Sequence, residues 1–205
     1  MIEEVMTGDL LWPLYGQPSD LAEIESVPLA QRGLPESTYA LLVRAKDLII
    51  RGGHNIDPAT IEDALLAHPQ VTAAGAVGRP GIHAGEVPVA YVSLIPSADI
   101  TETDLLHWAH QHVPERAAAP KTVTVLDALP VTDVGKPYRL GLRADATRRE
   151  FLDALSGITG VKSIIATIED GAIVATVELD HADGETVVAA ILARYPIAWR
   201  VAVRR

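Results

Sequence analysis

Strand-like and helix-like apolar patterns alternate along the chain from residue 44 onward. Short runs of Val, Ile and Ala that end at Gly, Pro or Asp predict strands. These runs cover residues 47–50, 71–77, 87–95 and 122–126. Apolar residues that recur every three or four positions predict helices over residues 57–68 and 103–112. The segments between them, 78–85 and 129–136, are predicted as loops.

The first of these helices has a clear start signal. Asp57 precedes Pro58, and an Asp side chain can accept from free backbone N–H groups while Pro suits the first helical turn. Glu62 is predicted to lie on the exposed face of this helix. The pair Gly52-Gly53 just before it interrupts the apolar pattern and predicts a tight turn.

The last sixty residues repeat this alternation on a smaller scale. Helices are predicted over residues 147–155 and 185–194, and strands over 161–168, 172–179 and 197–203. The fold class predicted is therefore α+β, with a small mixed α/β domain followed by a second small α/β subdomain of order αββαβ. We expect an N-terminal arm over residues 1–43, the mixed domain over 44–143 and the subdomain over 144–205.

Composition narrows the classes of partner. The 205 residues include 27 acidic and 17 basic side chains and carry a formal net charge of -10. Nucleic-acid binding needs clustered Lys and Arg, so no nucleic-acid partner is expected. No apolar stretch approaches the roughly 20 residues of a membrane span, and residues 1–9 hold three acidic and no basic residues. We therefore expect a cytoplasmic protein without a secretory signal.

Two segments carry candidate chemistry. Gly135 frees the backbone so that Lys136 can project from a loop between Pro130 and Pro137. A Lys at such a tip is a flexible point charge suited to carboxylate and phosphate oxygens. At Gly52-Gly53, two missing side chains leave room for a narrow ligand close to the backbone.

The same segments belong to a longer ordered pattern. It comprises Arg44 to Asp47, Gly52-Gly53 with Ile56-Asp57-Pro58, Ile61-Glu62, His68-Pro69, Gly85-Glu86, and Leu129 to Arg139. In this order and spacing, the chain resembles the C-terminal domain of acyl-CoA synthetases, the AMP-forming acid–CoA ligases of the adenylate-forming superfamily. The long-chain fatty-acid–CoA ligases are among them.

The resemblance implies an activity. Such enzymes activate a carboxylic acid with ATP, release pyrophosphate, and transfer the acyl group from the adenylate to the thiol of CoA, releasing AMP. It also implies that Lys136 is the adenylation lysine and that Asp47 is the hinge of the domain. Arg44 matches an arginine near the adenylate ribose, and Gly52 and Gly53 match the loop that lines the pantetheine channel.

The chain also departs from the family's pattern. It lacks a Ser/Thr/Gly-rich phosphate loop ending in Lys, and Val43 stands where the family usually has Gly. We therefore expect the large adenylation domain to be missing, with the N-terminal arm joined near Val43 directly to the domain of residues 44–143, the family's lid domain. The chain alone is then expected to be inactive. ATP with Mg²⁺ and CoA are then substrates, and no tightly bound cofactor is expected. Alternatives are a docking module for a separate adenylation subunit, CoA or an acyl carrier, and a deletion product that forms a homodimer.

The chain offers no convincing metal site. It has no cysteine, which excludes thiolate ligands. The spacing of His107, His110 and His112 cannot place all three on one face of a helix. No metal is therefore predicted.

Overall fold

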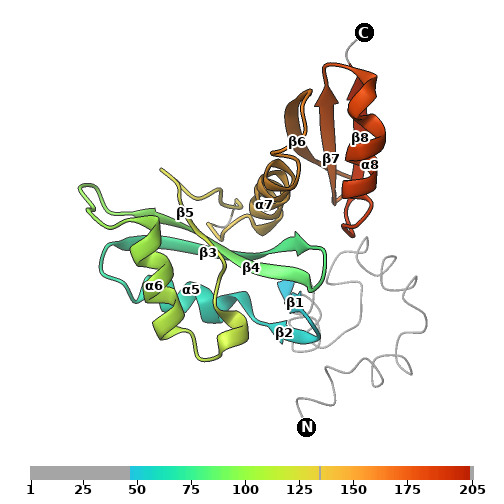
Figure 1. The fold of residues 1–205 in the computed structure, drawn as a ribbon. Coiled ribbons are helices and arrows are strands. Elements are labelled where there is room, and N and C mark those ends of the chain that lie inside the picture. The colour runs from blue at the N-terminus through green and yellow to red at the C-terminus, as the bar shows by residue number, and fades with distance from the viewer. Residues whose placement is uncertain (1–46, 134, 204–205) are drawn as a thin grey trace, which may run out of the picture. The chain divides into compact units, whose positions relative to one another are not determined.

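The computed structural model describes residues 47–133 and 135–203. Arg44 and Val43 lie outside this part of the chain. The described residues from Leu48 onward form one compact unit that contains two sheets with helices packed on them (Figure 1). The fold is mixed α/β, and the predicted fold class is confirmed.

The first sheet has five strands. The hairpin β1 (Ile49–Arg51) and β2 (His54–Ile56) adjoins the long hairpin β3 (Val71–Gly81) and β4 (Gly85–Leu94). The strand order is β2-β1-β4-β3, and the short β5 (Val123–Val125) pairs with β4 in parallel. The β3–β4 pairing continues to the ends of both strands, so most of the predicted loop at 78–85 is strand. Its glycines and Pro80 had masked the strand pattern.

Helices α5 (Pro58–Leu66) and α6 (Glu102–His112) have well-defined first turns. The Asp57 side chain accepts from the N–H of Ala59 at 2.9 Å, as the sequence predicts. Before α6, Thr101 and the helix's third residue, Asp104, form a reciprocal capping box. A short 3₁₀ turn, η2 (Arg116–Ala118), follows α6.

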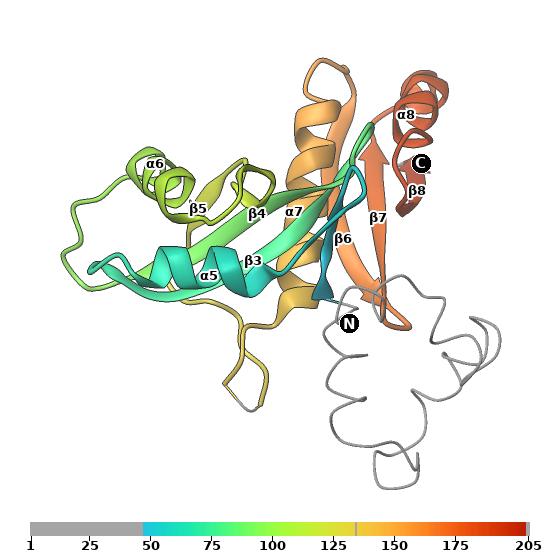
Figure 2. The same ribbon diagram turned by 90° about the horizontal axis from the view of Figure 1, so that it is seen from below.

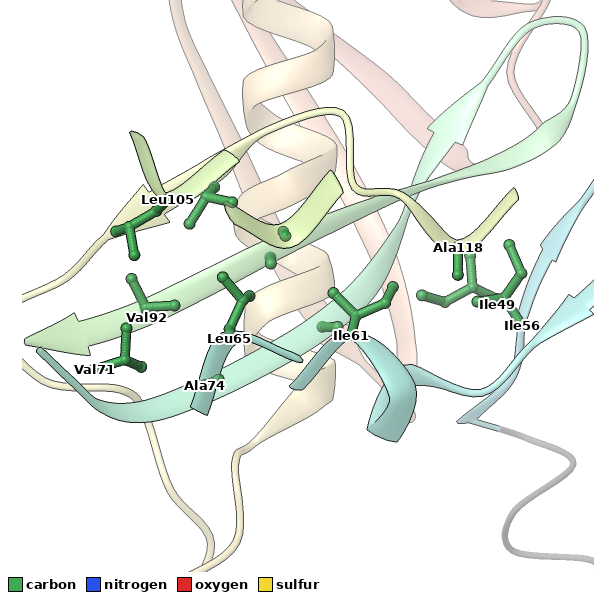
Figure 3. Close-up of a cluster of buried hydrophobic side chains, with 13 residues drawn as sticks. Ile49, Ile56, Ile61, Leu65, Val71, Ala74, Val92, Leu105 and Ala118 are labelled. Carbon is green, nitrogen blue, oxygen red and sulfur yellow. The ribbon is translucent and has the colours of Figure 1, made fainter. Parts of the chain in front are cut away.

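Period-two alternation gives the first sheet two buried faces. Ala90 and Val92 of β4 lie on the α5–α6 side, whereas Val89 and Tyr91 lie on the other. Figure 3 shows the cluster on the α5–α6 side, where side chains from both helices meet the sheet. Its fully buried members include Ile49, Ile56, Ile61, Leu65, Ala76, Ala90, Val92, Leu105, Ala109 and Ala118.

The other face is covered by α7 (Arg139–Ala154). The sequence predicts this helix from residue 147, but it starts at Arg139 because Leu142 and Ala146, one turn apart, pack on the sheet. The predicted domain boundary after residue 143 therefore falls inside a continuous helix. Among the described residues, no helix is long and apolar enough to cross a membrane.

The second sheet follows α7. Strands β6 (Val161–Glu169) and β7 (Ala172–Leu179) form a hairpin, and α8 (Glu185–Leu192) leads to β8 (Ala198–Val203), which pairs with β7 in parallel. A 3₁₀ turn, η3 (Ala182–Gly184), precedes α8. The predicted αββαβ order is confirmed. Its core joins the second half of α7 to the sheet through Phe151, Leu155, Ile164, Ala175, Val177, Leu179, Val188, Leu192 and Tyr195.

The first core yields a stability prediction. Ile61 is 0% exposed, whereas Ile50 is 53% exposed. We expect Ile61→Ala to lower the free energy of unfolding by about 2–5 kcal/mol, because it removes buried methyl groups and leaves a cavity. Urea denaturation measures the loss. The matched control Ile50→Ala should change stability by well under half as much, and equal losses would contradict the assignment of this core.

Candidate functional site

Lys136 lies on a tight loop between β5 and α7. The N–H of Thr132 donates to the carbonyl of Lys136 at 2.7 Å, and the N–H of Tyr138 donates to the carbonyl of Pro130 at 2.8 Å. Gly135 has a φ of +77°, a conformation that glycine adopts without steric cost. These contacts shape the loop and leave the Lys136 side chain exposed.

A charged pair fixes the C-terminal end of this loop. Arg139, three residues after Lys136 and the first residue of α7, donates to Glu62 of α5 through two nitrogens, with Nη2 2.9 Å from Oε2. Oε1 of Glu62 also accepts from the N–H of Ala76 at 2.9 Å. Glu62 is thus not on an exposed face, because its side chain is 12% exposed and that of Arg139 is 28% exposed.

The predicted channel glycines form the turn between β1 and β2. Gly52 and Gly53 have φ values of +54° and +87°, and a Cβ on either would meet nothing within 4 Å. Both residues are exposed. The N–H of Gly52 donates to the carbonyl of Ala84 at 2.8 Å, which anchors the turn to the β3–β4 hairpin. The geometry leaves the open backbone surface that the sequence predicts.

Glu86 connects the strand after the predicted hinge to the rest of the unit. Its Oε2 accepts from the N–H of Ile50 at 3.0 Å, and its Oε1 lies 3.7 Å from Nη2 of Arg143. Arg143 also donates to the carbonyl of Leu48 at 3.4 Å. A Cβ on Gly78 would lie 2.4 Å from the Glu86 carboxyl carbon, so Gly78 leaves the space that this side chain occupies.

Asp47, the predicted hinge, is half-buried and immediately precedes the segment held by Glu86 and Arg143. Arg44, the predicted nucleotide contact, lies outside the described residues. The loop carrying Lys136 and the β1–β2 turn project from different parts of the unit (Figure 2). The structure therefore presents two separate exposed loops.

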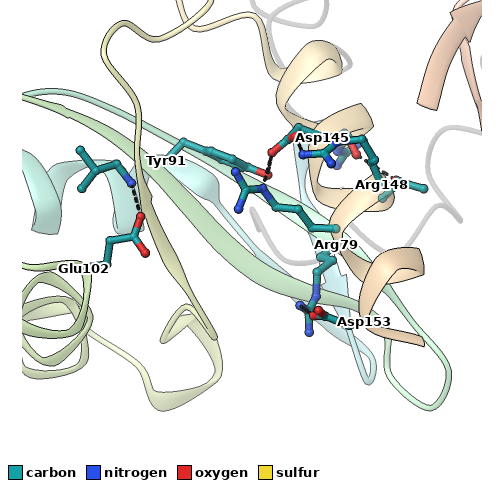
Figure 4. Close-up of polar contacts among 10 residues, drawn as sticks. Arg79, Tyr91, Glu102, Asp145, Arg148 and Asp153 are labelled. Carbon is teal, nitrogen blue, oxygen red and sulfur yellow. Dashed lines mark hydrogen bonds and ion pairs between the residues drawn. The ribbon is translucent and has the colours of Figure 1, made fainter. Parts of the chain in front are cut away.

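A groove of about 530 Å³ lies between α6, β5 and α7, and neither Lys136 nor the glycine turn lines it. Its lining includes Arg79, Arg148 and Arg149, each of which is paired with a carboxylate. Figure 4 shows Tyr91 and Arg148 directed toward Asp145. The arginines that line this groove are therefore paired with carboxylates of the same compact unit.

Asp145 accepts hydrogen bonds from two arginines and a phenol. Burial alone would raise the pKa of its carboxyl, but hydrogen bonds from Arg149, Arg148 and Tyr91 outweigh burial and hold the pKa below its ordinary value. Burial and the neighbouring Asp145 carboxylate raise the pKa of Tyr91. The phenol therefore remains a donor at neutral pH.

The three histidines of α6 do not converge. His110 Nε2 lies 2.8 Å from the carbonyl of Pro120, and His112 stacks on Trp108 with ring centroids 3.7 Å apart. Within the described part of the chain, no group of three or more His, Cys, Asp or Glu side chains is placed to hold a metal ion.

The structure adds positioning groups that the sequence reading had not assigned. The Glu62–Arg139 pair joins two segments of the ordered motif. Because these segments carry opposite charges, the sequence could have suggested that Glu62 and Arg139 pair. Glu86 belongs to the ordered motif, and its carboxylate accepts a hydrogen bond from the N–H of Ile50. Arg143 carried no signal, because it lies in a helix turn that was not predicted.

The Glu62–Arg139 pair can be tested by a double-mutant cycle. We expect Glu62→Gln and Arg139→Gln each to lower the free energy of unfolding by about 1–3 kcal/mol, because each removes the charged partner of a largely buried side chain. The double variant should lose less than the sum, with a coupling above about 0.5 kcal/mol. The exposed pair Glu169–Arg200 is the control, and an equal or larger coupling there would contradict this ranking.

Asp145 makes stability depend on pH. Its folded pKa is depressed, so its stabilisation is present above the unfolded pKa of about 3.9 and is lost as pH falls toward the folded pKa. Asp145→Asn should therefore be less stable than the parent at neutral pH, with the difference shrinking below about pH 4. Thermal unfolding across pH measures this, with exposed Asp127→Asn as control. A difference that does not vary with pH would refute the assignment.

Comparisons with known proteins find one family and several relatives that are similar to part of this chain. Residues 60–136 match the family model of the AMP-binding enzyme C-terminal domain. The marinolic acid–CoA ligase of Pseudoalteromonas sp. (strain SANK 73390) is 44% identical over 115 residues, covering 55% of this chain and 18% of that protein. The 2-succinylbenzoate–CoA ligase of Bacillus cereus (strain AH820) is 42% identical over 108 residues, covering 53% of this chain and 22% of that protein.

Among solved structures, apo MatB from Rhodopseudomonas palustris is 33% identical, with a TM-score of 0.47, over 50% of this chain and 20% of that one. The matches span about a fifth of the length of the two curated relatives. The family match ends at Lys136 and includes Glu62. Residues 60–136 of this chain therefore match the AMP-binding enzyme C-terminal domain, and this part of the chain is similar to CoA ligases.

Proposed function

We propose that this chain is the C-terminal portion of an ATP-dependent acid–CoA ligase, with Lys136 serving adenylation and the Gly52–Gly53 turn serving CoA. The observation that carries the proposal is the exposed Lys136 on a loop whose end is fixed by the Glu62–Arg139 pair. The two curated relatives described above are named as CoA ligases. ATP with Mg²⁺, CoA and a carboxylic acid are the substrates proposed for the whole enzyme.

In the proposed adenylation step, a carboxylate oxygen attacks the α-phosphorus of ATP, and the bond to pyrophosphate breaks. The Lys136 ammonium neutralises charge on the carboxylate and α-phosphate oxygens as they approach. The thiol of CoA, having lost its proton, then attacks the acyl carbon, and AMP leaves with the oxygen that had joined it to the acyl group. The glycine turn leaves space for the narrow pantetheine arm in this second step.

Exposed apolar residues lie beside both loops. Val131 and Tyr138 flank the Lys136 loop and are 59% and 38% exposed, and Ile50 next to the glycine turn is 53% exposed. Exposed apolar groups near functional loops favour docking against another surface. We propose that each loop docks on the adenylation domain in one half-reaction, after rotation about Asp47. Arg44 is proposed to approach the adenylate ribose.

The other reading, a docking module for a separate adenylation subunit, rests on the same exposed residues. Because the matches span about a fifth of the relatives' length, we expect this chain by itself to release no AMP. Positioned phosphate and carboxylate contacts supply most of the rate enhancement in such chemistry, and one Lys cannot replace them.

The role of Lys136 can be tested in a chimaera. The C-terminal domain of the Bacillus cereus 2-succinylbenzoate–CoA ligase is replaced by residues 44–205 of this chain, and AMP release is measured with ATP, Mg²⁺, CoA and 2-succinylbenzoate. We expect activity in the chimaera and a loss of about 100-fold or more in Lys136→Ala, since a charge-stabilising contact is removed. ATP–pyrophosphate exchange should fall equally, whereas acyl transfer from preformed acyl-adenylate should persist.

Lys121→Ala is the matched control, because Lys121 is also an exposed lysine in a loop of the same domain. It should leave both half-reactions unchanged. An active chimaera that is insensitive to Lys136→Ala would overturn the assigned role of this lysine. AMP release by the unmodified chain alone would show that a complete site exists within these residues.

A further inference from the structure

The turn between β3 and β4 supports the proposed CoA turn directly. The carbonyl of Ala84 accepts from the N–H of Gly52 at 2.8 Å. Gly85, with a φ of +73°, lies so close to β1 that a Cβ there would be 3.2 Å from the carbonyl oxygen of Ile50. The next residue, Glu86, accepts from the N–H of Ile50. The position of the β1–β2 turn therefore depends on the position of the β3–β4 turn.

The same β3–β4 turn is held from the other side by the C-terminal subdomain. Ile82 packs against the core that Phe151, Leu179 and Leu192 help to form. Ile82 and Ala84 are two residues apart, so one short turn contacts both the subdomain core and the proposed CoA turn.

Three polar side chains, Arg79, Glu150 and Tyr195, reinforce the contact between the β3–β4 turn and the subdomain, and we call them the Arg79–Glu150–Tyr195 relay. Nε of Arg79, near the end of β3, lies 2.8 Å from Oε2 of Glu150 on α7, and the two side chains are 14% and 15% exposed. The hydroxyl of Tyr195, which follows α8, donates to Oε1 of Glu150 at 2.9 Å. Arg79 also lies 3.7 Å from Asp153. Loss of Glu150 would leave the largely buried Arg79 without this ion-pair partner and the Tyr195 hydroxyl without its acceptor, which is costly.

The Tyr195 hydroxyl remains a donor to Glu150 at neutral pH. Burial raises the pKa of Tyr195 to about 12, and the hydrogen bond to Glu150 acts in the same direction. The ring of Tyr195 also packs on Phe151 of α7, with centroids 5.2 Å apart. The link from subdomain to β3 is therefore both apolar and polar, and it uses residues from β3, α7 and the segment after α8.

We propose that the C-terminal subdomain is a positioning element for the β1–β2 turn, acting through Ile82 and the Arg79–Glu150–Tyr195 relay. The inference rests on the proposed role of Gly52 and Gly53 in binding CoA, and it assigns the subdomain to the thiol-transfer half-reaction. The Lys136 loop has a different support, namely its own hydrogen bonds and the Glu62–Arg139 pair. The two loops are thus held by separate sets of contacts.

Amide hydrogen exchange of the full chain, followed by NMR, tests whether the subdomain holds the β1–β2 turn in place. The amide of Gly52 reports on the β1–β2 turn, and the amide of Thr132 reports on the Lys136 loop, because each donates a backbone hydrogen bond. Ile82→Ala and Tyr195→Phe should each speed exchange at Gly52 several-fold relative to Thr132, since local opening becomes easier. Ile165→Ala, an exposed residue of the same subdomain, should not change this ratio.

The ratio separates a local effect from general destabilisation, which would speed both amides together. The proposal would be overturned if amide exchange became faster by the same factor at Gly52 and Thr132. It would also be overturned if the exchange rate at Gly52 stayed unchanged in both variants. Tyr195→Phe keeps the ring in the core and removes only the donor to Glu150, so it covers the case in which Ile82→Ala fails to fold.

A second readout connects the relay to chemistry. In the active chimaera, Tyr195→Phe should slow acyl transfer to CoA several-fold and leave ATP–pyrophosphate exchange unchanged. Equal slowing of both steps would contradict a specific role in thiol transfer. The amide hydrogen-exchange experiment needs no enzymatic activity. An inactive chimaera therefore bears on the proposed function alone, and unchanged hydrogen exchange at the Gly52 amide bears on this inference alone.

Discussion

The buried carboxylate of Glu62 needs a charged partner, and its contacts connect α5, α7 and β3 around the candidate site. Glu62 is largely buried on α5, and it pairs with Arg139 at the start of α7 while accepting from Ala76 on β3. Removing a buried charge's partner is costly, so these three elements keep a fixed relation. Lys136 lies three residues from this pair, and its loop has a defined end point while its side chain stays exposed.

Helix α7 extends this constraint to the rest of the compact unit. Its first half packs on one face of the five-stranded sheet through Leu142 and Ala146, and its second half contributes Phe151 to the other core, which Leu155 just after the helix also joins. A helix with apolar contacts on both halves cannot be divided at residue 143 without opening one core. The predicted division into a domain and a subdomain therefore describes two cores that share one helix.

The separate supports of the two loops suit a lid that serves two reactions in turn. If the proposed function holds, the Lys136 loop and the glycine turn act at different times, and each must be ordered independently of the other. Glu62 and Arg139 hold the first, while the β3–β4 turn and Glu86 hold the second. Under the proposed function, we expect a change in one support to alter one half-reaction without loosening the loop used in the other.

The sequence by itself determined the features that depend on residues close together in the chain. The type and order of the elements, the Asp57 cap, the Gly52–Gly53 turn and the exposed Lys136 loop follow from apolar periodicity, capping chemistry and glycine's backbone freedom. The ordered motif also predicted the family, and the comparisons confirmed it.

Only the tertiary structure decided which distant groups meet. Glu62 and Arg139 are 77 positions apart, and Arg143 and Leu48 are 95 apart, so no local pattern could pair them. The early start of α7 depends on burial of Leu142 against the sheet, and the packing of Ile82 depends on the core of the last subdomain. Such contacts form only when the whole chain has packed, because burial and the cost of unpaired charge select among arrangements that local propensity leaves equal.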